Sequence, residues 1–322
     1  MVTVLVVIAV MPTAEHDRGS YRHEALLYAG IDEFTTRVGA FVRDGLDADE
    51  VVLVVVTAEK IARLRDLLGG DAARVHFRDM LEVGQNPARI VQAWRDLIAR
   101  HVPDGATARG VGEPVWPERT ASELAECHTH EASLNVAFDD SLRFWLICPY
   151  DTAALDPTVI GDALRTHPYV RQRWTARPSP RYRAPRRWRP AALPDLGAPL
   201  QQHRFDASRM YAIRRVVADH AAALGFSTER AEDAILAVNE VMTNSVRYGG
   251  ACGTVALWHQ GRTLVCEVHD RGRIEPVLAG RIRPPHAQAG GHGLWIANQC
   301  CDLVQIRCDP SGTTVRLFIS RH

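Results

Sequence analysis

Three polar residues within a predicted helix, residues 231–248, have types and spacing suited to phosphate chemistry. Glu240, Asn244 and Arg247 stand at i, i+4 and i+7, so they share one face of the helix. An amide oxygen such as that of Asn244 can bind Mg²⁺, a hard ion satisfied by few protein ligands plus phosphate. The opposite face is apolar, with Ile235, Val238, Met242 and Val246. Taken alone, the polar face could equally be solvated surface, because helices have polar faces by default.

Glycine-containing motifs downstream of this helix favour a nucleotide site. Asp270 ends a predicted strand two residues before Gly272, residues 290–293 (GGHG) open the next helix, and Gly312 begins the last strand. Glycines let a loop backbone approach a phosphate, and a helix start offers unpaired N–H groups to it. A buried carboxylate such as that of Asp270 can accept a hydrogen bond from an adenine amino group.

In this order within residues 204–322, the motifs resemble the ATP-binding domain shared by gyrase, heat-shock chaperones, histidine kinases and anti-sigma-factor kinases, the GHKL superfamily. The resemblance implies a domain that binds ATP and Mg²⁺, with Glu240 as the general base and Asn244 as the Mg²⁺ ligand. It also implies that residues 271–290 form a lid over the phosphates. The other residues that it assigns to nucleotide binding are Arg247, Asp270, Gly272, Gly291, Gly293, Leu294 and Thr313.

Within the superfamily, the closest resemblance is to the anti-sigma-factor serine kinases. The stretch NEVMTNSVRYG at 239–249 is typical of them, as is a short lid that contains proline. Ile274 departs from the family pattern, because it replaces the second glycine of D-x-G-x-G where the lid begins. That departure puts catalytic competence in question. A histidine kinase would need an upstream phospho-accepting histidine, and His203 and His220 lack the neighbours of such a site.

The pattern of residues 204–322 predicts an α+β sandwich, with helices packed on one face of a mostly antiparallel sheet. Two helices come first, at 207–224 and 228–248. Strands are expected at 252–259 and 263–269, and the lid then leads to a helix at 293–301. Two closing strands, 303–308 and 313–319, pair across the turn sequence at 309–312.

Residues 20–170 alternate between helical and strand patterns, which predicts an α/β domain whose parallel sheet has helices on both sides. Expected helices are 31–46, 58–68, 86–100 and 120–138, and expected strands are 51–56, 75–77 and 144–148. Five stretches resemble the MEDS sensory domain, namely 23–28, 84–87, 112–117, 130–131 and 148–151. The resemblance implies a RecA-like fold. The single lysine, Lys60, does not stand in a P-loop sequence, so this domain should not hydrolyse ATP through one.

Four polar residues at these motif positions are candidates for a sensory-ligand site: His23, Glu113, Glu131 and Tyr150. They stand near predicted strand ends or helix starts, where open α/β sheets place ligands. The alternative is that each is a buried polar group with satisfied hydrogen bonds that fixes a loop. His128 and His130 are two apart on a predicted helix and so on different faces, which argues against a paired metal site.

Residues 171–203 are predicted to link the two domains. Eight arginines and three prolines lie within 171–189, interleaved with Trp174, Tyr182 and Trp188 and without an acidic residue. We favour a stiff, solvated linker. The alternatives are a nucleic-acid strap, in which arginine meets phosphate and aromatic rings stack on bases, and a contact for an acidic partner.

The composition is that of a globular protein: 46% of the residues are hydrophobic, and 38 basic residues balance 38 acidic ones. No whole-molecule charge therefore points to nucleic acid or to an acidic membrane. The seven cysteines have no C-x-x-C spacing, which argues against a disulfide framework and against a structural zinc site. The apolar run at 2–11 is too short for a membrane span, so residues 1–19 are predicted to be an N-terminal tail.

These features predict a cytoplasmic regulator of transcription initiation under the control of a sensory domain. By the resemblance, it is an anti-sigma factor that binds a sigma factor and uses ATP and Mg²⁺ to phosphorylate a serine of a STAS-type anti-anti-sigma protein. No direct nucleic-acid or membrane partner is expected, and pairing into a homodimer is possible. The alternatives are an inactive ATP-binding module that sequesters its partner and, ranked last, a histidine kinase.

Overall fold

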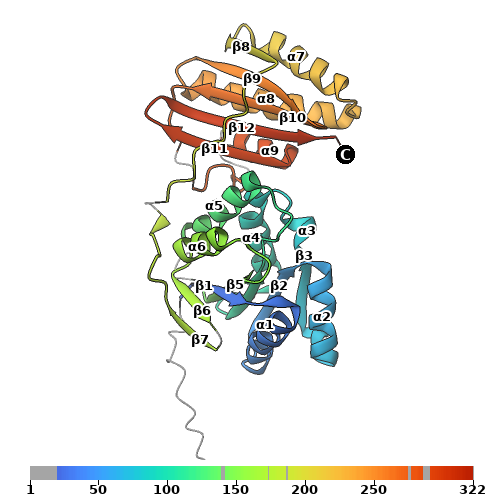
Figure 1. The fold of residues 1–322 in the computed structure, drawn as a ribbon, viewed down its shortest axis with the longest axis vertical. Helices are drawn as coiled ribbons and strands as arrows, with labels where there is room; N and C mark the ends of the chain where they lie inside the picture. Colours follow the sequence, from blue (N-terminus) through green and yellow to red (C-terminus); the bar gives the residue numbers. More distant parts are fainter. Residues whose placement is uncertain are drawn as a thin grey trace, which may run out of the picture.

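The structure of the protein, a computed structural model, describes residues 20–138, 142–172, 174–185, 188–274, 277–285 and 291–321. The predicted tail at 1–19 lies outside the described residues, as do parts of the predicted lid, including Gly290. Two domains are stacked along the long axis of the molecule, and helix α5 (Ala121–Ala137) of the N-terminal domain lies close to the C-terminal domain (Figure 1).

The N-terminal domain is built on a seven-stranded sheet with the strand order β3-β2-β4-β5-β1-β6-β7. Strands β1 to β6 run parallel, and β7 at the edge is antiparallel to β6. The strands are β1 (Arg22–Tyr28), β2 (Val51–Val56), β3 (Val75–Asp79), β4 (Ala108–Gly112), β5 (Phe144–Asp151), β6 (Tyr169–Gln172) and β7 (Thr175–Pro178). The parallel-dominated sheet predicted for this half of the chain is thus present.

Helices cover both faces of this sheet, because its central strands are apolar on both sides. Val54 of β2 packs in one core with α1 and α2, whereas its neighbour Leu53 packs in the other with α4, α5 and α6. The helices are α1 (Gly30–Asp47), α2 (Ala58–Leu68), α3 (Met80–Val83), α4 (Ile90–His101), α5 and α6 (Pro157–Thr166). Thr120 and Glu123 form the predicted capping box at the start of α5.

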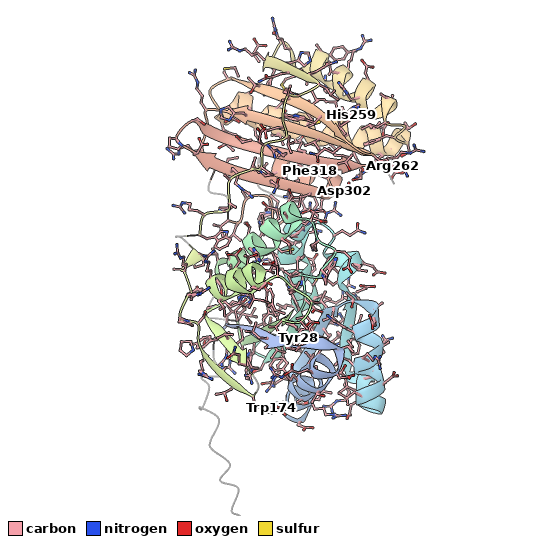
Figure 2. The ribbon with its side chains drawn as sticks, in the orientation of Figure 1. Tyr28, Trp174, His259, Arg262, Asp302 and Phe318 are labelled. Carbon is pink, nitrogen blue, oxygen red and sulfur yellow. The ribbon has the colours of Figure 1, made fainter. Side chains whose placement is uncertain are left out.

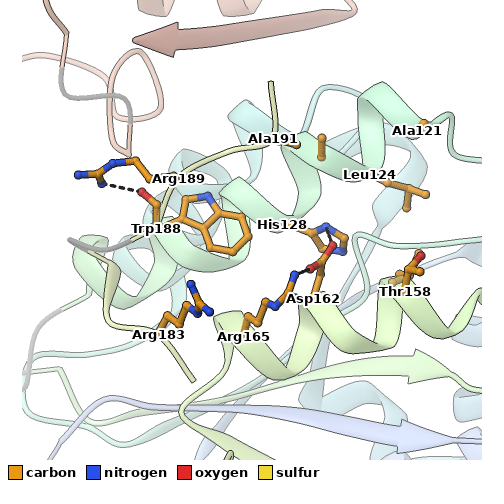
Figure 3. A pocket seen from close by; sticks show the side chains of 12 residues that line it. Ala121, Leu124, His128, Thr158, Asp162, Arg165, Arg183, Trp188, Arg189 and Ala191 are labelled. Atoms are coloured by element: carbon orange, nitrogen blue, oxygen red, sulfur yellow. Dashed lines mark hydrogen bonds and ion pairs between the residues drawn. The ribbon is translucent and has the colours of Figure 1, made fainter. Parts of the chain in front are cut away.

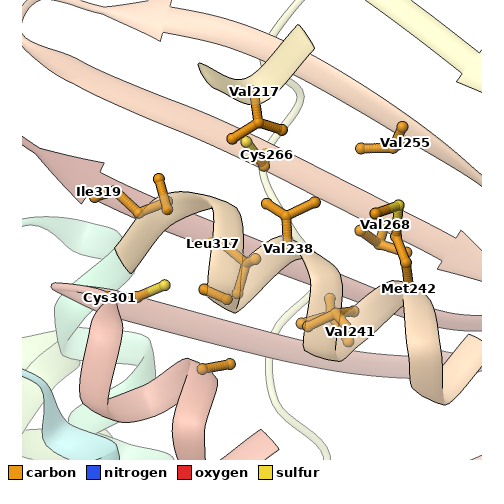
Figure 4. Close-up of a cluster of buried hydrophobic side chains, with 14 of the residues drawn as sticks. Val217, Val238, Val241, Met242, Val255, Cys266, Val268, Cys301, Leu317 and Ile319 are labelled. Carbon is orange, nitrogen blue, oxygen red and sulfur yellow. The ribbon is translucent and has the colours of Figure 1, made fainter. Parts of the chain in front are cut away.

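The C-terminal domain has a five-stranded antiparallel sheet, in the order β11-β12-β10-β9-β8, covered by helices. Val238 and Met242 of α8 pack on Cys266 and Leu317 of the sheet (Figure 4). The elements are β8 (Gln201–Asp206), α7 (Met210–Ala223), α8 (Thr228–Tyr248), β9 (Cys252–Gln260), β10 (Thr263–Asp270), α9 (Gly293–Cys300), β11 (Leu303–Asp309) and β12 (Gly312–Ser320).

The structure differs from the sequence prediction at both ends of the predicted linker. Residues 169–172 (β6) and 175–178 (β7) pair antiparallel, and residues 201–206 form β8, where the prediction had the second domain open at 204 with two helices. These short strands lie at or near sheet edges and are largely exposed. They therefore lack the apolar pattern by which a strand is recognised.

Three carbonyl groups further along the predicted linker are bonded by the C-terminal domain. Trp174, between β6 and β7, is 63% exposed (Figure 2). Further along, Arg307 Nε donates to Ala191 O, Arg316 Nη1 donates to Pro194 O over 2.8 Å, and Trp258 Nε1 donates to Gly197 O over 3.1 Å. The linker is thus held on the C-terminal sheet through its carbonyl groups.

Candidate functional site

Helix α8 presents the carboxylate and the amide expected to handle a nucleotide. Ser227 caps the helix, because its hydroxyl accepts from Arg230 N, and Val238, Val241 and Met242 are buried in the core with the sheet. Glu240 and Asn244 are consequently left half-buried on the other side, and Arg247, one turn further, is exposed. The predicted common face is therefore present at Glu240 and Asn244, while Arg247 faces solvent.

The first residue of α9 faces this pair. A Cβ at Gly293 would lie 3.0 Å from Glu240 Oε2 and 3.1 Å from Asn244 Nδ2, so both side chains touch the start of the helix. Unpaired N–H groups at a helix start attract anions. Gly291, just upstream, has a φ of 84°, a conformation that glycine adopts without strain. Leu294 packs against the C-terminal core and anchors the helix.

Asp270 lies at the end of β10 with its carboxylate enclosed by glycine backbone. Oδ1 accepts from Gly272 N and Oδ2 accepts from Ser245 Oγ, each over 2.6 Å. A Cβ at Gly272 would lie 2.8 Å from Gly249 Cα and 2.9 Å from Asp270 Oδ1, so glycine is needed for this close approach. Each carboxylate oxygen keeps acceptor capacity beyond the bond that it already makes.

Two further residues complete this corner of the site. Thr313 Oγ1 donates to Gly272 O over 2.8 Å, so it positions the loop backbone after Asp270 and does not bond the carboxylate. Ser245, which bonds the carboxylate directly, was missed by the sequence analysis. Its signal was available, because Ser245 is a hydroxyl residue on the buried side of α8 beside Asn244.

The described part of the predicted lid, residues 271–274 and 277–285, is held by the N-terminal domain. Arg281 Nη2 donates to Glu126 Oε2 of α5 over 2.8 Å, and both side chains are almost fully buried. Burial lowers the pKa of Arg281, and the nearby Glu126 carboxylate opposes that shift. Ser133 Oγ of the same helix donates to Val277 O over 2.6 Å, and Ile282 packs against the N-terminal core.

The N-terminal domain also contacts the other end of α9. Asn86 Nδ2 donates to Cys301 O over 3.2 Å, and Arg89 donates to the carbonyls of Asn298 and Gln299. These carbonyls lie at the C-terminal end of α9, where cations and donors are stabilising. Helix α9 is therefore fixed at its C-terminal end by the N-terminal domain, while its N-terminal end faces Glu240.

The structure brings together three of the four residues expected to bind a sensory ligand. His23 Nε2 lies 3.1 Å from Glu131 Oε2, and Tyr150 Oη donates to Glu131 Oε1 over 3.2 Å. Glu113 lies elsewhere and pairs with Lys60. Its carboxylate accepts from Lys60 Nζ and from the hydroxyl of Tyr28 (Figure 2), each over 2.6 Å.

An open pocket of about 610 Å³ lies between α5, α6 and the linker (Figure 3). Its lining includes Arg165, Arg183 and Trp188, so the linker closes one of its sides. The pocket also exposes the Asp162 carboxylate, which pairs with Arg165 over 2.6 Å and with His128 over 3.3 Å. It lies away from the residues that surround Asp270 and Gly293, and it does not reach the cluster around Glu131.

Two protein-family models match parts of the chain. Residues 204–319 match the histidine kinase-like ATPase domain. Residues 22–168 match the MEDS domain, described as the methanogen/methylotroph, DcmR sensory domain. No curated protein matches the chain. Within the described residues, no helix is both long enough and apolar enough to cross a membrane.

Histidine kinase-like ATPase domains bind ATP, usually with Mg²⁺, and the residues of this site fit such a ligand. The Asp270 carboxylate, held by Ser245 and Gly272, keeps acceptor capacity for the amino group of a base. The start of α9 offers N–H groups for phosphate, next to the amide oxygen of Asn244, a ligand type that Mg²⁺ accepts. A sensory domain joined to a kinase-like ATPase domain indicates a regulatory ATPase or kinase.

Proposed function

We propose that the chain is an anti-sigma factor with serine kinase activity. It binds a sigma factor, and it phosphorylates a serine of a STAS-type anti-anti-sigma protein with ATP. The observation that supports this most is the convergence of Glu240 and Asn244 on Gly293, next to the Asp270 corner. That arrangement offers separate positions for the adenine base at Asp270, for the phosphates at the start of α9 and for the serine proton at Glu240.

In the transfer step, Glu240 accepts the proton of the partner's serine hydroxyl as the serine oxygen attacks the γ-phosphorus and ADP leaves. Asn244 holds Mg²⁺, which neutralises charge on the phosphates. The N–H groups at the start of α9 stabilise the same negative charge. Asp270 holds the adenine amino group, so that the triphosphate is directed toward α9.

Control by the sensory domain acts through the lid in this proposal. Residues 277–283 are bonded to α5 by Glu126 and Ser133, and the C-terminal end of α9 is bonded by Asn86 and Arg89. A change in the sensory domain that moves α5 would therefore move the lid. The lid orders donors around the γ-phosphate, so its position sets the rate of transfer.

A second candidate is an ATP-binding module that sequesters its partner without phosphorylating it. Ile274 favours this candidate, because a β-branched residue replaces glycine at the start of the lid and restricts its backbone. The contacts that hold the lid to α5 favour it as well, since they oppose closure over a nucleotide.

Incubation of the full chain with γ-labelled ATP, Mg²⁺ and purified STAS-domain proteins separates the candidates. The kinase proposal expects acid-stable label on a partner serine. ATP binding without transfer to any partner that the chain binds supports sequestration instead. Acid-labile label on the chain itself would indicate a histidine kinase. The two histidines considered as phosphate acceptors for a histidine kinase are hydrogen-bonded to other side chains, His203 to Gln201 and His220 to His259.

A further inference from the structure

A fully buried group of four potential metal ligands lies in the N-terminal domain. His23 comes from β1, Glu131 from α5, Cys148 from β5, and His167 directly follows α6. No one of the four is more than 1% exposed. The sequence analysis argued against a structural zinc site because the chain has no C-x-x-C motif. That argument does not cover this group, because its ligands come from four separate parts of the chain.

Four of the six separations between the ligand atoms are close to those of a tetrahedral site around one ion. All four ligand atoms lie within 4.8 Å of one another. Glu131 Oε2 is 3.1 Å from His23 Nε2, 3.3 Å from His167 Nε2 and 3.4 Å from Cys148 Sγ, and His23 Nε2 is 3.3 Å from that sulfur. In a tetrahedral zinc site with Zn–N of about 2.0 Å and Zn–S of about 2.3 Å, ligand atoms are separated by roughly 3.3–3.6 Å.

Hydrogen bonds outside the group orient the His23 imidazole for metal binding. Asn135 Nδ2 donates to the carbonyls of Glu131 and Thr166, so its Oδ1 must be the atom that lies 3.1 Å from His23 Nδ1. An amide oxygen only accepts, so Nδ1 of His23 carries a proton. The Nε2 lone pair of a neutral His23 then faces the group.

The His167 imidazole is oriented in the same way. Its Nδ1 lies 2.8 Å from Ala163 O, which only accepts, so the proton is again on Nδ1. Within the described part of the chain, His167 Nε2 has no hydrogen-bond partner, although it lies 3.3 Å from Glu131 Oε2. Two lone pairs and a carboxylate oxygen therefore converge, an arrangement that a shared cation stabilises. Metal-bound histidines characteristically donate their second N–H to such acceptors.

The second oxygen of Glu131 is engaged elsewhere. Tyr150 Oη donates to Oε1, which leaves Oε2 to face both imidazoles and the Cys148 sulfur. The carboxylate is thus oriented to give one ligand atom. Oxygen-seeking ions such as Mg²⁺ and Ca²⁺ do not suit a set of two nitrogens and one sulfur, whereas zinc accepts all three atom types.

We propose that His23, Glu131, Cys148 and His167 bind one zinc ion in a closed, four-coordinate structural site. On binding, the thiol proton of Cys148 is released to solvent and the sulfur binds as thiolate, with no change of oxidation state. The ion joins β1, α5, β5 and the segment after α6. It thereby fixes α5, the helix whose Glu126 and Ser133 hold residues 277–283.

Metal content of the full chain, purified without chelators, tests the site. Elemental analysis is expected to find about one zinc per chain. After removal of zinc and loading with Co²⁺, the protein should show the visible bands of tetrahedral cobalt and a thiolate-to-cobalt charge-transfer band. A folded chain with less than about a tenth of an equivalent of zinc and no such bands after loading would overturn the proposal.

Cys148→Ser locates the ion, with Cys127→Ser as the matched control. Cys127 is also buried but bonds Pro114 O outside the group. The Cys148 variant should lose the charge-transfer band and at least about tenfold in metal affinity, whereas the control should keep both. A band that persists in Cys148→Ser would place the metal on another cysteine and refute the assignment. If Cys148→Ser does not fold, the zinc content and the cobalt spectrum of the parent chain still test whether the site binds a metal.

Discussion

Arg281 of the lid segment and Glu126 of α5 form a buried ion pair, with Nη2 2.8 Å from Oε2, that joins the two domains. Glu126 Oε1 also accepts from Arg307 Nη1 of β11 over 2.8 Å. One carboxylate of the sensory domain thus holds both the lid and the sheet of the ATPase domain. The contact lies between the two modules that the family comparisons identify, at a segment expected to move when a nucleotide binds.

Replacing Arg281 by Gln should loosen the lid. The change removes a charge-assisted hydrogen bond worth about 1.5–3 kcal/mol, which corresponds to an opened population greater by roughly 10–100-fold. Hydrogen exchange of residues 277–285 should accelerate accordingly. Arg262→Gln, at the exposed turn between β9 and β10 (Figure 2), serves as control. Unchanged exchange in the Arg281 variant would mean that other contacts hold the segment.

Glu240→Gln should reduce phosphotransfer by about 10²–10⁴-fold, because a positioned general base contributes that much. Nucleotide affinity should change little, since the amide keeps the shape of the side chain. The matched control is Glu232→Gln, two turns earlier on α8 and exposed. The measurement is the rate at which label from ATP is transferred to the partner serine. Equal rates in the parent chain and in Glu240→Gln would show that Glu240 is not the general base.

Asp270→Asn should weaken ATP binding by about 10–100-fold, because a hydrogen bond to a charged acceptor is worth roughly 1.5–3 kcal/mol. The amide of Asn cannot accept at both positions that now bond Ser245 and Gly272. Titration calorimetry with a non-hydrolysable ATP analogue measures the loss. Asp309→Asn, in the exposed β11–β12 turn, should bind like the parent. Full affinity in Asp270→Asn would show that adenine is bound elsewhere.

Acidification should destabilise the N-terminal domain through His130. Burial lowers the pKa of His130 to about 3, against about 6.5 in an unfolded chain. Below about pH 6.5 the unfolded state therefore binds a proton that the folded state does not. Stability then falls toward pH 3 by up to about 1.4 kcal/mol per pH unit.

His130→Leu should make the stability of the N-terminal domain less dependent on pH. Urea unfolding of the full chain at pH 7, 6 and 5 measures this stability. His203→Gln, a partly exposed histidine of the other domain, should leave the pH dependence unchanged. An equal slope in the parent chain and in His130→Leu would assign the acid sensitivity to other groups, such as His128, whose pKa burial also lowers.

The sequence could predict those parts of the fold and site that depend on neighbouring residues. Local periodicity gave α2 and β2 with the observed ends, and helical spacing placed Glu240 and Asn244 on one face. The glycines around Asp270 were predictable as well, because close backbone approach requires that residue type.

The remaining features depend on residues that are distant in sequence. Strand β8 has no apolar signature and forms because β9 offers an edge. Glu126 and Arg281 are 155 residues apart, and no spacing rule links them. The group around Glu131 likewise needs four elements to be packed before its ligands meet. Among the proposed sensory residues, the sequence analysis predicted the strand that carries Tyr150 but not β1, which carries His23, or β4, which precedes Glu113. The separate location of Glu113 follows from the strand order.

A single helix, α5, carries Glu131 at the centre of the sensory domain and Glu126 and Ser133 at the lid. If occupancy of one domain alters affinity in the other, thermodynamic reciprocity requires the influence to run equally in both directions. A signal that weakens nucleotide binding by a given factor is itself bound more weakly, by the same factor, when nucleotide is abundant. The threshold at which such a protein responds would then rise and fall with the energy status of the cell.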